Sequence, residues 1–343
     1  EPAPEPAPEP EPAPLLSIEE TCEARLVAED VYERLDEWTV EVVVPEGVGG
    51  YLVAPTAPGR QVFNVTLEGP GGGVDFIDQF PQGNANAAVL GDSNPILVPS
   101  APELVPLTMP GVYTMTVLAE VAPCSTVVVR LGGGSRLDVN VYDVAGAAAR
   151  VDLNATLRTL VGLYRQAGIE IGETRRFFIP SQEAGSLRIL RSEEDVFRVT
   201  ALSREPGPSV RERLSINMFI VDQILLEGGG VLGVSAGIPG RAGAHGIRGA
   251  GVVITAEVAD DPVVMGQVMA HELGHFLGLF HTSEANGHAF DPVPDTPECP
   301  EGSWRRPERC PDIRNLMFPF AGDDHLTLTA GQADVLRANP LVH

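Results

Sequence analysis

Three histidines and one glutamate stand at a fixed spacing in the run HELGHFLGLFH. His271 and His275 are four residues apart, so on a helix both imidazoles project from one face and can share a metal ion. Zinc binds imidazole nitrogen at ~2.0–2.1 Å and demands a third ligand in the same small volume. Glu272 lies about 100° round the helix from His271, beside such an ion, where a general base belongs.

The third histidine can reach the same ion only if the helix ends before it. On an unbroken helix His281 would lie ~9 Å beyond His275 and on a different face. Gly278 supplies a residue that can adopt a left-handed conformation and turn the chain back. The alternative is a chance pattern on a core helix. Random placement of 7 His, 37 Gly and 47 acidic residues would produce it roughly 4 times in 100,000 chains of this length, which favours the metal site.

The elements that must position these residues follow one another between residues 136 and 343. Periodicity predicts a strand at 137–144, a helix at 151–168 that ends at Gly168, strands at 214–224 and 249–258, and the motif helix at 263–278. Thr329 and Gln332 form a capping box that opens a last short helix ending near Arg337. This order predicts an α/β (α+β) catalytic domain with a sheet covered by helices on one face, its upper part extending to about 278 and its lower part covering 279–343.

The chain before residue 136 has a different texture. Short β-rich runs alternate with Gly/Pro turns over 15–130 and predict an all-β, sandwich-like domain. No histidine occurs before His245, so we interpret this domain as a binding or spacer module. LGGGS at 131–135 predicts a hinge. The alternating prolines of 1–14 predict an extended tract that is either a tether or a disordered terminus.

Composition limits the partners and the compartment. A formal net charge of -24 argues against nucleic acid and anionic lipid, and no apolar run approaches the ~20 residues that cross a bilayer. The four cysteines fit two disulfides in an oxidising compartment. Local distance favours Cys299–Cys310 and leaves Cys22–Cys124, although Cys22 or Cys124 could instead hold the zinc of a zymogen. Because residue 1 is not Met, we expect that an export signal preceded it.

The zinc motif, together with NLMF at 315–318, resembles the metzincin clan of zinc endopeptidases. The resemblance implies that Met317 is the methionine of the Met-turn, packed under the metal ligands. Within the clan, the segments DPVPDTPEC and RCPD resemble the pappalysin-like group. The resemblance covers about residues 137–343 and implies a twisted sheet with an active-site helix, one catalytic Zn²⁺ and a protein or peptide substrate.

The chain departs from that family pattern at two positions. Pro319 stands two residues after the methionine, where metzincins often carry a tyrosine, so no tyrosine there can stabilise an oxyanion. Phe318 stands where the pappalysin-like group usually has an aspartate, which removes the family's reason to prefer a basic residue after the scissile bond. Asp323 or Asp324 could substitute, or could belong to a solvated turn.

Two further features depend on the resemblance. The strand around Val252, Val253 and Ile254 resembles the edge strand that metzincins offer to an extended substrate. Asp291 and Asp295 either bind Ca²⁺, as the resemblance suggests, or stabilise a turn through Asx hydrogen bonds.

We therefore predict a secreted or surface-tethered zinc endopeptidase. Three neutral imidazoles leave one tetrahedral position for a water, and Glu272 accepts its proton as the water attacks the scissile carbonyl. The enzymatic alternative is a metzincin-like aminopeptidase or narrow processing enzyme. The alternative from another class is a surface adhesion or binding protein with a retained but little-used protease fold.

Overall fold

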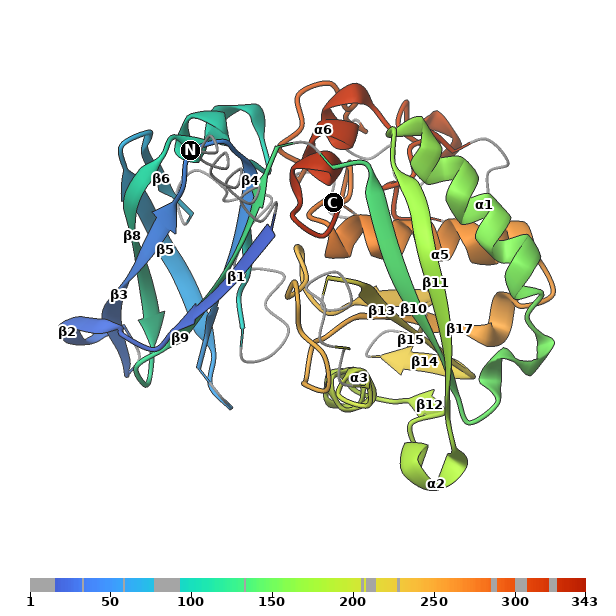
Figure 1. The fold of residues 1–343 in the computed structure, drawn as a ribbon. Coiled ribbons are helices and arrows are strands. Elements are labelled where there is room, and N and C mark those ends of the chain that lie inside the picture. The colour runs from blue at the N-terminus through green and yellow to red at the C-terminus, as the bar shows by residue number, and fades with distance from the viewer. Residues whose placement is uncertain are drawn as a thin grey trace, which may run out of the picture.

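The computed structural model describes residues 16–32, 34–57, 59–76, 93–132, 134–204, 207, 214–226, 229–284, 289–299, 307–320 and 326–343. The predicted tether at 1–14 lies outside them. Two bodies, a β-rich part and an α/β part, lie side by side in Figure 1.

The β-rich part consists of two antiparallel sheets that enclose a core of their own. Strand β8 alternates buried and more exposed residues along its length, as expected of a strand that faces a core on one side only. The four-stranded sheet has the order β1 (Leu16–Thr21), β9 (Cys124–Leu131), β4 (Val48–Thr56), β7 (Ile96–Val98). The five-stranded sheet has the order β2 (Arg25–Tyr32), β3 (Leu35–Val44), β8 (Gly111–Ala119), β5 (Val62–Gly69), β6 (Gly72–Asp75), and the 3-10 helix η1 spans Pro102–Thr108.

The α/β part is built on a mixed five-stranded sheet. Its first four strands run parallel and the fifth is antiparallel. The order is β11 (Glu170–Ile179), β10 (Arg136–Val144), β13 (Ile216–Val221), β17 (Val252–Thr255), β16 (Gly233–Ser235). A second small sheet contains β12 (Ile189–Leu190), β14 (Gln223–Leu226) and β15 (Gly229–Gly230).

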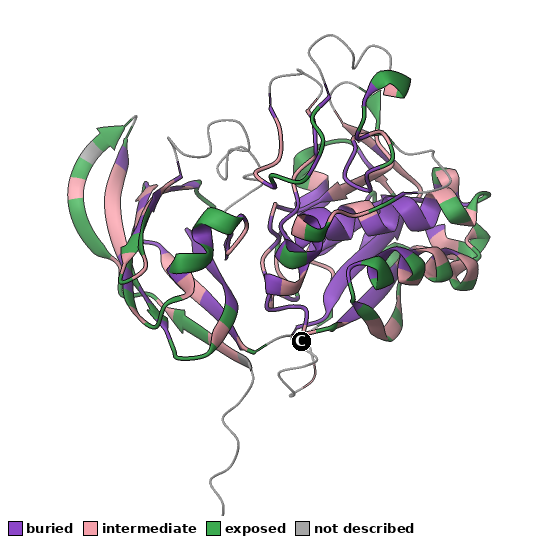
Figure 2. Ribbon diagram, turned by 90° about the horizontal axis from the view of Figure 1, so that it is seen from above, coloured by how far each residue is buried: buried purple, intermediate pink, exposed green. Residues whose placement is uncertain are grey.

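Helices cover both faces of this sheet, so the prediction of helices on one face is wrong. Helices α1 (Leu153–Gln166) and α5 (Pro262–Phe276) pack in the core on one face. Helix α3 (Glu193–Thr200) packs with Phe219 and Val253 in the core on the other. The central strands β13 and β17 are buried throughout, which is the usual state of parallel strands covered on both faces. Figure 2 shows buried residues concentrated in the sheet and α5.

Side-chain caps define where the main helices begin. Asp152 accepts the Ala155 N–H at 3.0 Å at the start of α1, and Asp261 accepts the N–H groups of the first turn of α5. Thr329 forms the predicted capping box with Gln332. The remaining short helices are η2 (Ala147–Arg150), α2 (Ser181–Ala184), η3 (Ala256–Val258), η5 (Pro307–Arg309) and α6 (Ala330–Ala338).

The two parts share a hydrophobic core. Leu52, Leu97 and Val128 of the β-rich part lie in one buried cluster with Val335 and Leu336 of α6. Helix α6 and the residues after it lie between the two bodies in Figure 1. The β-rich part is therefore packed against the α/β part and not merely joined to it.

Polar contacts close the same junction. Buried Arg130 donates from Nη1 to the Val342 carbonyl oxygen at 2.8 Å, and burial lowers its pKa to about 10. Gly134 and Ser135, in the segment predicted as a hinge, lie against the last two residues of the described chain. Ser135 donates its N–H to the His343 carbonyl at 3.3 Å, and a Cβ on Gly134 would lie 2.0 Å from the Val342 oxygen.

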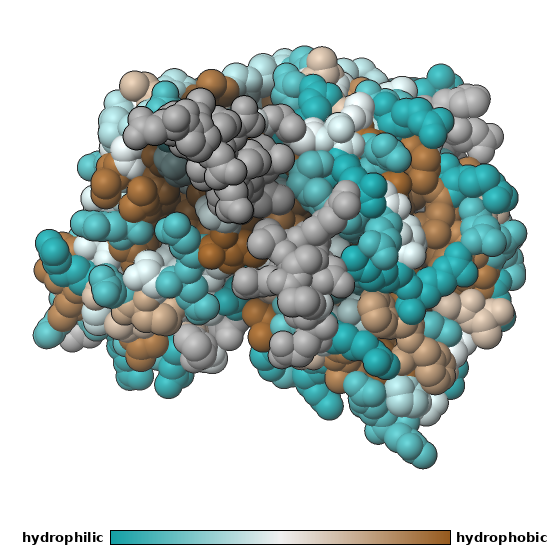
Figure 3. Space-filling view, in the orientation of Figure 1, coloured by the Kyte–Doolittle hydropathy of each residue, from teal (hydrophilic) through white to brown (hydrophobic). Residues whose placement is uncertain are grey.

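The structure pairs Cys22 with Cys124 and Cys299 with Cys310, which confirms the predicted pairing. Among the described residues, no helix is long and apolar enough to cross a membrane. The face drawn in Figure 3 mixes hydrophilic and hydrophobic residues over both parts of the molecule.

A glycine substitution tests the junction. A Cβ on Gly50 would lie 2.0 Å from the Ala338 carbonyl oxygen, which is backbone and cannot swing aside. Gly50→Ala should therefore destabilise the protein by about 1–3 kcal/mol. Gly162→Ala is the control, because its Cβ on α1 meets open space and Ala is favoured over Gly in a helix by about 0.5–1 kcal/mol. Thermal unfolding followed by circular dichroism should give a lower midpoint for the first variant only; equal midpoints would contradict the tight junction.

Candidate functional site

Helix α5 carries His271, Glu272 and His275. Most of its residues are buried against one face of the sheet. Tyr164 of α1 donates its hydroxyl proton to the Ala270 carbonyl oxygen at 3.2 Å, immediately before the first histidine. The helix is therefore held by a neighbouring helix at the turn that carries the motif.

The helix ends and reverses at Gly278, as the spacing predicted. This glycine has φ +112°, a conformation that residues with a Cβ rarely adopt. Its N–H donates to the His275 carbonyl at 2.9 Å, and the Leu279 N–H donates to the Gly274 carbonyl at 2.9 Å. These bonds close the last turn of α5 and send the chain back toward the cleft.

The reversal brings the three histidines together. The Nε2 atom of His281 lies 3.2 Å from Nε2 of His271 and 3.1 Å from Nε2 of His275. Nitrogen ligands at ~2.0–2.1 Å in a tetrahedral zinc site lie about 3.3–3.4 Å from one another. The spacing of the three nitrogen atoms therefore fits a single zinc ion.

The hydrogen bonds of the other ring nitrogens decide what the three Nε2 atoms can do. His271 Nδ1 lies 2.7 Å from the Leu316 carbonyl oxygen, and His275 Nδ1 lies 2.7 Å from the Leu279 carbonyl oxygen. A carbonyl oxygen only accepts, so each of these Nδ1 atoms carries the proton. Glu284 Oε1 lies 3.0 Å from Nδ1 of His281 and accepts in the same way.

With every Nδ1 protonated, a neutral imidazole offers a lone pair at Nε2. The three Nε2 atoms cannot hydrogen-bond to one another, because each is an acceptor. Three converging lone pairs form a site that can bind a cation, and imidazole suits zinc. The donor set of this chain therefore fits the zinc ion that its motif predicts.

Burial keeps the ligands neutral. Burial, together with the nearby His281, lowers the pKa of His271 to about 4, although the bond to the Leu316 carbonyl acts in the opposite direction. Burial also holds the pKa of His275 well below its usual range, helped by the neighbouring histidines. Near neutral pH both rings are uncharged and able to bind a metal ion.

Glu272 lies against the edge of the sheet. A Cβ on Gly233 would lie 2.5 Å from its Cγ, so the side chain fits there only because β16 carries a glycine. Burial raises the pKa of Glu272 to about 8, although a hydrogen bond from the backbone of Ser235 acts in the opposite direction. The carboxyl group is thus held between α5 and β16, next to the histidine cluster.

The strand that borders the cleft is β16, which corrects the expectation for Val252, Val253 and Ile254. Those residues form β17, which lies between β13 and β16 and is fully buried. The true edge strand consists of Gly233–Ser235. Its three residues sit in a glycine-rich stretch, where no alternation of side chains reveals a strand.

Met317 lies beneath the motif helix. A Cβ on Gly274 would lie 2.6 Å from its sulfur atom, and its carbonyl oxygen accepts the Thr282 N–H at 3.1 Å. Asn315 fixes this turn, because its Oδ1 accepts the Met317 N–H at 2.9 Å while its carboxamide pairs with that of Gln332. In the sequence, Gln332 is recognisable only as a helix cap, and Asn315 only as the first residue of NLMF.

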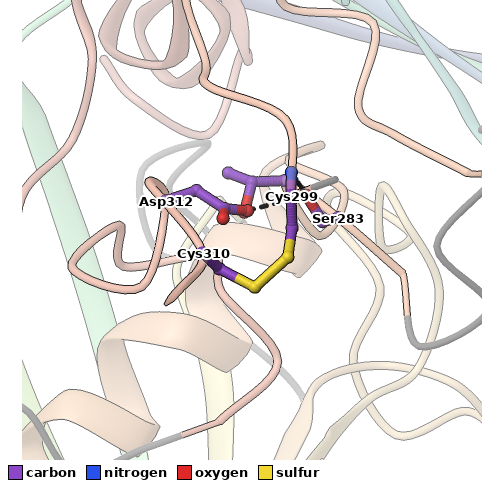
Figure 4. The surroundings of a disulfide bond; sticks show 5 residues. Ser283, Cys299, Cys310 and Asp312 are labelled. Carbon is purple, nitrogen blue, oxygen red and sulfur yellow. Dashed lines mark hydrogen bonds between the residues drawn. A yellow bond between two sulfur atoms is a disulfide. The ribbon is translucent and has the colours of Figure 1, made fainter. Parts of the chain in front are cut away.

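A buried carboxylate joins the third ligand to the local disulfide. Thr282 and Ser283 directly follow His281 in sequence. Both donate their hydroxyl protons to Asp312, at 2.7 Å each. Ser283 in turn accepts the N–H of Cys299 at 2.9 Å. Figure 4 shows Ser283, Asp312 and the two cysteines lying together. The only sign of Asp312 in the sequence is its place two residues after Cys310, in the segment RCPD.

Asp291 accepts hydrogen bonds within its own turn, and Asp295 accepts one from the start of helix α6. Asp291 accepts the Val293 N–H at 3.3 Å and the Thr296 hydroxyl proton, and burial raises its pKa to about 7. Asp295 accepts the Gly331 N–H at 2.9 Å. The Asp291–Val293 contact is an Asx turn, as one alternative expected, whereas the Asp295–Gly331 contact joins residues 36 positions apart. Asp323 and Asp324 lie outside the described residues.

No protein-family model and no curated protein matches this chain. Among solved structures, archaemetzincin from Methanopyrus kandleri is similar with a TM-score of 0.32 and 15% identity, over 59% of this chain and 88% of that chain. Metalloproteinase-II from Bacteroides fragilis is similar with a TM-score of 0.35 and 11% identity, over 63% of this chain and 62% of that chain. At such TM-scores the chemistry of this chain has to follow from its own residues.

The burial of Glu272 predicts a pH dependence of stability in the metal-free protein. Its folded pKa of about 8 lies above its ordinary value of 4.5, so the folded state holds a proton that the unfolded state releases. The free energy of unfolding should therefore fall as pH rises from about 4.5 to 8, by about 1.4 kcal/mol for each pH unit.

Glu272→Gln removes this titration and isolates it from that of other groups. In the presence of chelator, the variant should gain a few kcal/mol over the wild type between pH 4.5 and 8. Denaturant unfolding at several pH values measures the difference. A difference that stays constant with pH would show that the carboxyl is not buried as described.

Proposed function

We propose that the protein is a zinc-dependent endopeptidase of the metzincin type. The observation that carries this proposal is the convergence of three imidazole lone pairs beside a buried carboxyl group, on the floor of an open cleft. His271, His275 and His281 would hold the ion. When bound, zinc supplies a Lewis acid that polarises a carbonyl and lowers the pKa of a water.

Glu272 has the position and the proton affinity of a general base. It follows His271 on α5 and leans against β16, so it lies between the histidine cluster and the strand that borders the cleft. Burial raises its pKa, which makes the carboxylate a better proton acceptor. It takes a proton from the attacking water, holds it and passes it to the leaving amine.

The edge strand β16 is the proposed binding site for an extended substrate. It is the last strand of its sheet and lines the cleft, so a peptide can add to it as a further strand. Main-chain hydrogen bonding of this kind accepts many sequences, which suits a protease.

The cleft favours an endopeptidase over the aminopeptidase alternative. Among the described residues that line it, Glu272 is the only acidic one. An aminopeptidase needs a second negative group to bind the α-ammonium of its substrate, because the first must act on the water. The intact general base also argues against an adhesion protein with an unused protease fold.

The disulfides and the sequence around them support a cellular location and a group within the clan. The two disulfides support a secreted or surface location, since such bonds persist in oxidising compartments. The pappalysin-like pattern around Cys299 and Cys310 supports that group within the clan, while Phe318 departs from it.

Glu272→Gln tests the proposed function. The variant should bind one zinc ion per chain, as the wild type does, because the three imidazoles are untouched. Its cleavage of casein should fall by at least about 100-fold, the usual contribution of a general base. Zinc content by elemental analysis and cleavage assays measure the two effects.

Glu257→Gln is the matched control, since this exposed glutamate on η3 lies outside the described lining of the cleft and should leave cleavage unchanged. Wild-type protein that binds no zinc would contradict the metal site. A Glu272→Gln variant that binds zinc and cleaves at the wild-type rate would contradict the role of the carboxylate.

The cleft also predicts a preference in substrates. Its described lining includes a group of apolar residues, Leu316, Phe318, Pro319, Phe320 and Leu326. Desolvating a charge there without a partner is costly. Peptides with Leu or Phe next to the scissile bond should therefore be cleaved at least about ten-fold faster than matched peptides with Asp. A peptide library read by mass spectrometry measures this; equal rates would contradict an apolar wall.

A further inference from the structure

The end of α5 depends on partners far away in sequence. The Leu279 N–H donates to the Gly274 carbonyl, and the Gly278 N–H donates to the His275 carbonyl. The next two carbonyl groups, those of Phe276 and Leu277, accept from donors outside the turn. The Phe276 carbonyl accepts the Gly240 N–H at 2.9 Å. The Leu277 carbonyl accepts from outside the motif altogether.

That last donor is Asn339. Its Nδ2 lies 3.0 Å from the Leu277 carbonyl oxygen, and its Oδ1 accepts the Leu341 N–H at 3.0 Å. The Asn339 side chain is fully buried, with both ends of its carboxamide hydrogen-bonded. Loss of its donor would leave a buried helix-terminal carbonyl unsatisfied.

The turn after α5 also contacts Leu97 of β7, in the β-rich part. A Cβ on Gly278 would lie 2.9 Å from Leu97 Cδ2, so the leucine packs directly on the glycine that reverses the chain. Leu97 is buried and belongs to the same hydrophobic cluster as Leu277 and Leu279. One face of the turn is therefore closed by a strand that precedes the motif by more than 170 residues.

The position of this turn controls two of the three proposed ligands. The Leu279 carbonyl accepts from Nδ1 of His275 at 2.7 Å and so fixes the orientation of that ring. His281 follows two residues later and reaches the other imidazoles only because of the reversal. A shift at Gly278 would move both.

We propose that Leu97 and Asn339 are positioning residues of the metal centre, and that the β-rich part serves as a structural support for the zinc ligands. The inference rests on the proposed zinc site. It gives the β-rich part a role inside the molecule, in place of the binding or spacer module expected from its sequence.

Zinc affinity measured by chelator competition tests the inference. Asn339→Asp keeps the shape of the side chain but replaces the donor to Leu277 with an acceptor. Leu97→Ala removes the contact with Gly278. Each variant should bind zinc at least about ten-fold more weakly than the wild type, the size of effect seen when groups that orient metal ligands are removed.

Leu67→Ala is the matched control. Leu67 is as fully buried as Leu97 and lies in the β-rich part, but it belongs to the separate core between the two sheets. This variant should lower the melting temperature while its zinc dissociation constant stays within two-fold of the wild type. A purely structural role for Leu97 would lower the melting temperature in both variants and change zinc affinity in neither.

Wild-type zinc affinity in folded Leu97→Ala and Asn339→Asp would overturn the inference while leaving the proposed function intact. Failure of the wild type to bind zinc would instead overturn the proposed function. Leu97→Val, a smaller truncation, provides the same comparison with a weaker effect if Leu97→Ala does not fold, and Leu97→Met, which keeps the volume, should restore zinc affinity.

Discussion

The structure depends on one electrostatic constraint, which is that three neutral imidazoles point their lone pairs at a common centre. His271, His275 and His281 can do so only if each Nδ1 keeps its proton and each ring avoids a positive charge. Burial meets the second condition at His271 and His275, where it lowers the pKa of both rings. A bound cation would satisfy all three lone pairs at once, and imidazole suits zinc.

The first condition explains why distant segments meet at the site. The three acceptors for Nδ1 belong to the turn before Met317, to the reversal after α5 and to the segment after His281. Each segment has its own support: the Asn315–Gln332 amide pair, the contacts of Leu97 and Asn339, and the buried carboxylate of Asp312. The β-rich part and α6 are thus connected to the metal centre by packing as well as by the chain.

Much of the site could be predicted because its spacing is local. The histidine spacing, the glycine reversal and the Cys299–Cys310 pair are all present in the structure, and the Cys22–Cys124 pair follows as the remaining one. The features that the sequence did not reveal lack a local pattern. Strand β16 is too short and glycine-rich to show alternation, so Val252 was assigned to an edge that it does not occupy. The contacts of Asp312 and Asn339 link residues 30 and 62 positions apart, and no local pattern announces them.

X-ray absorption at the zinc edge of the purified protein tests the central claim most directly, since it reports the atoms bound to the ion. The account predicts one zinc per chain with three imidazole nitrogens at about 2.0–2.1 Å and one oxygen ligand. The same spectrum from His281→Ala should show two imidazoles. A first shell containing sulfur, or fewer than three imidazoles in the wild type, would contradict it.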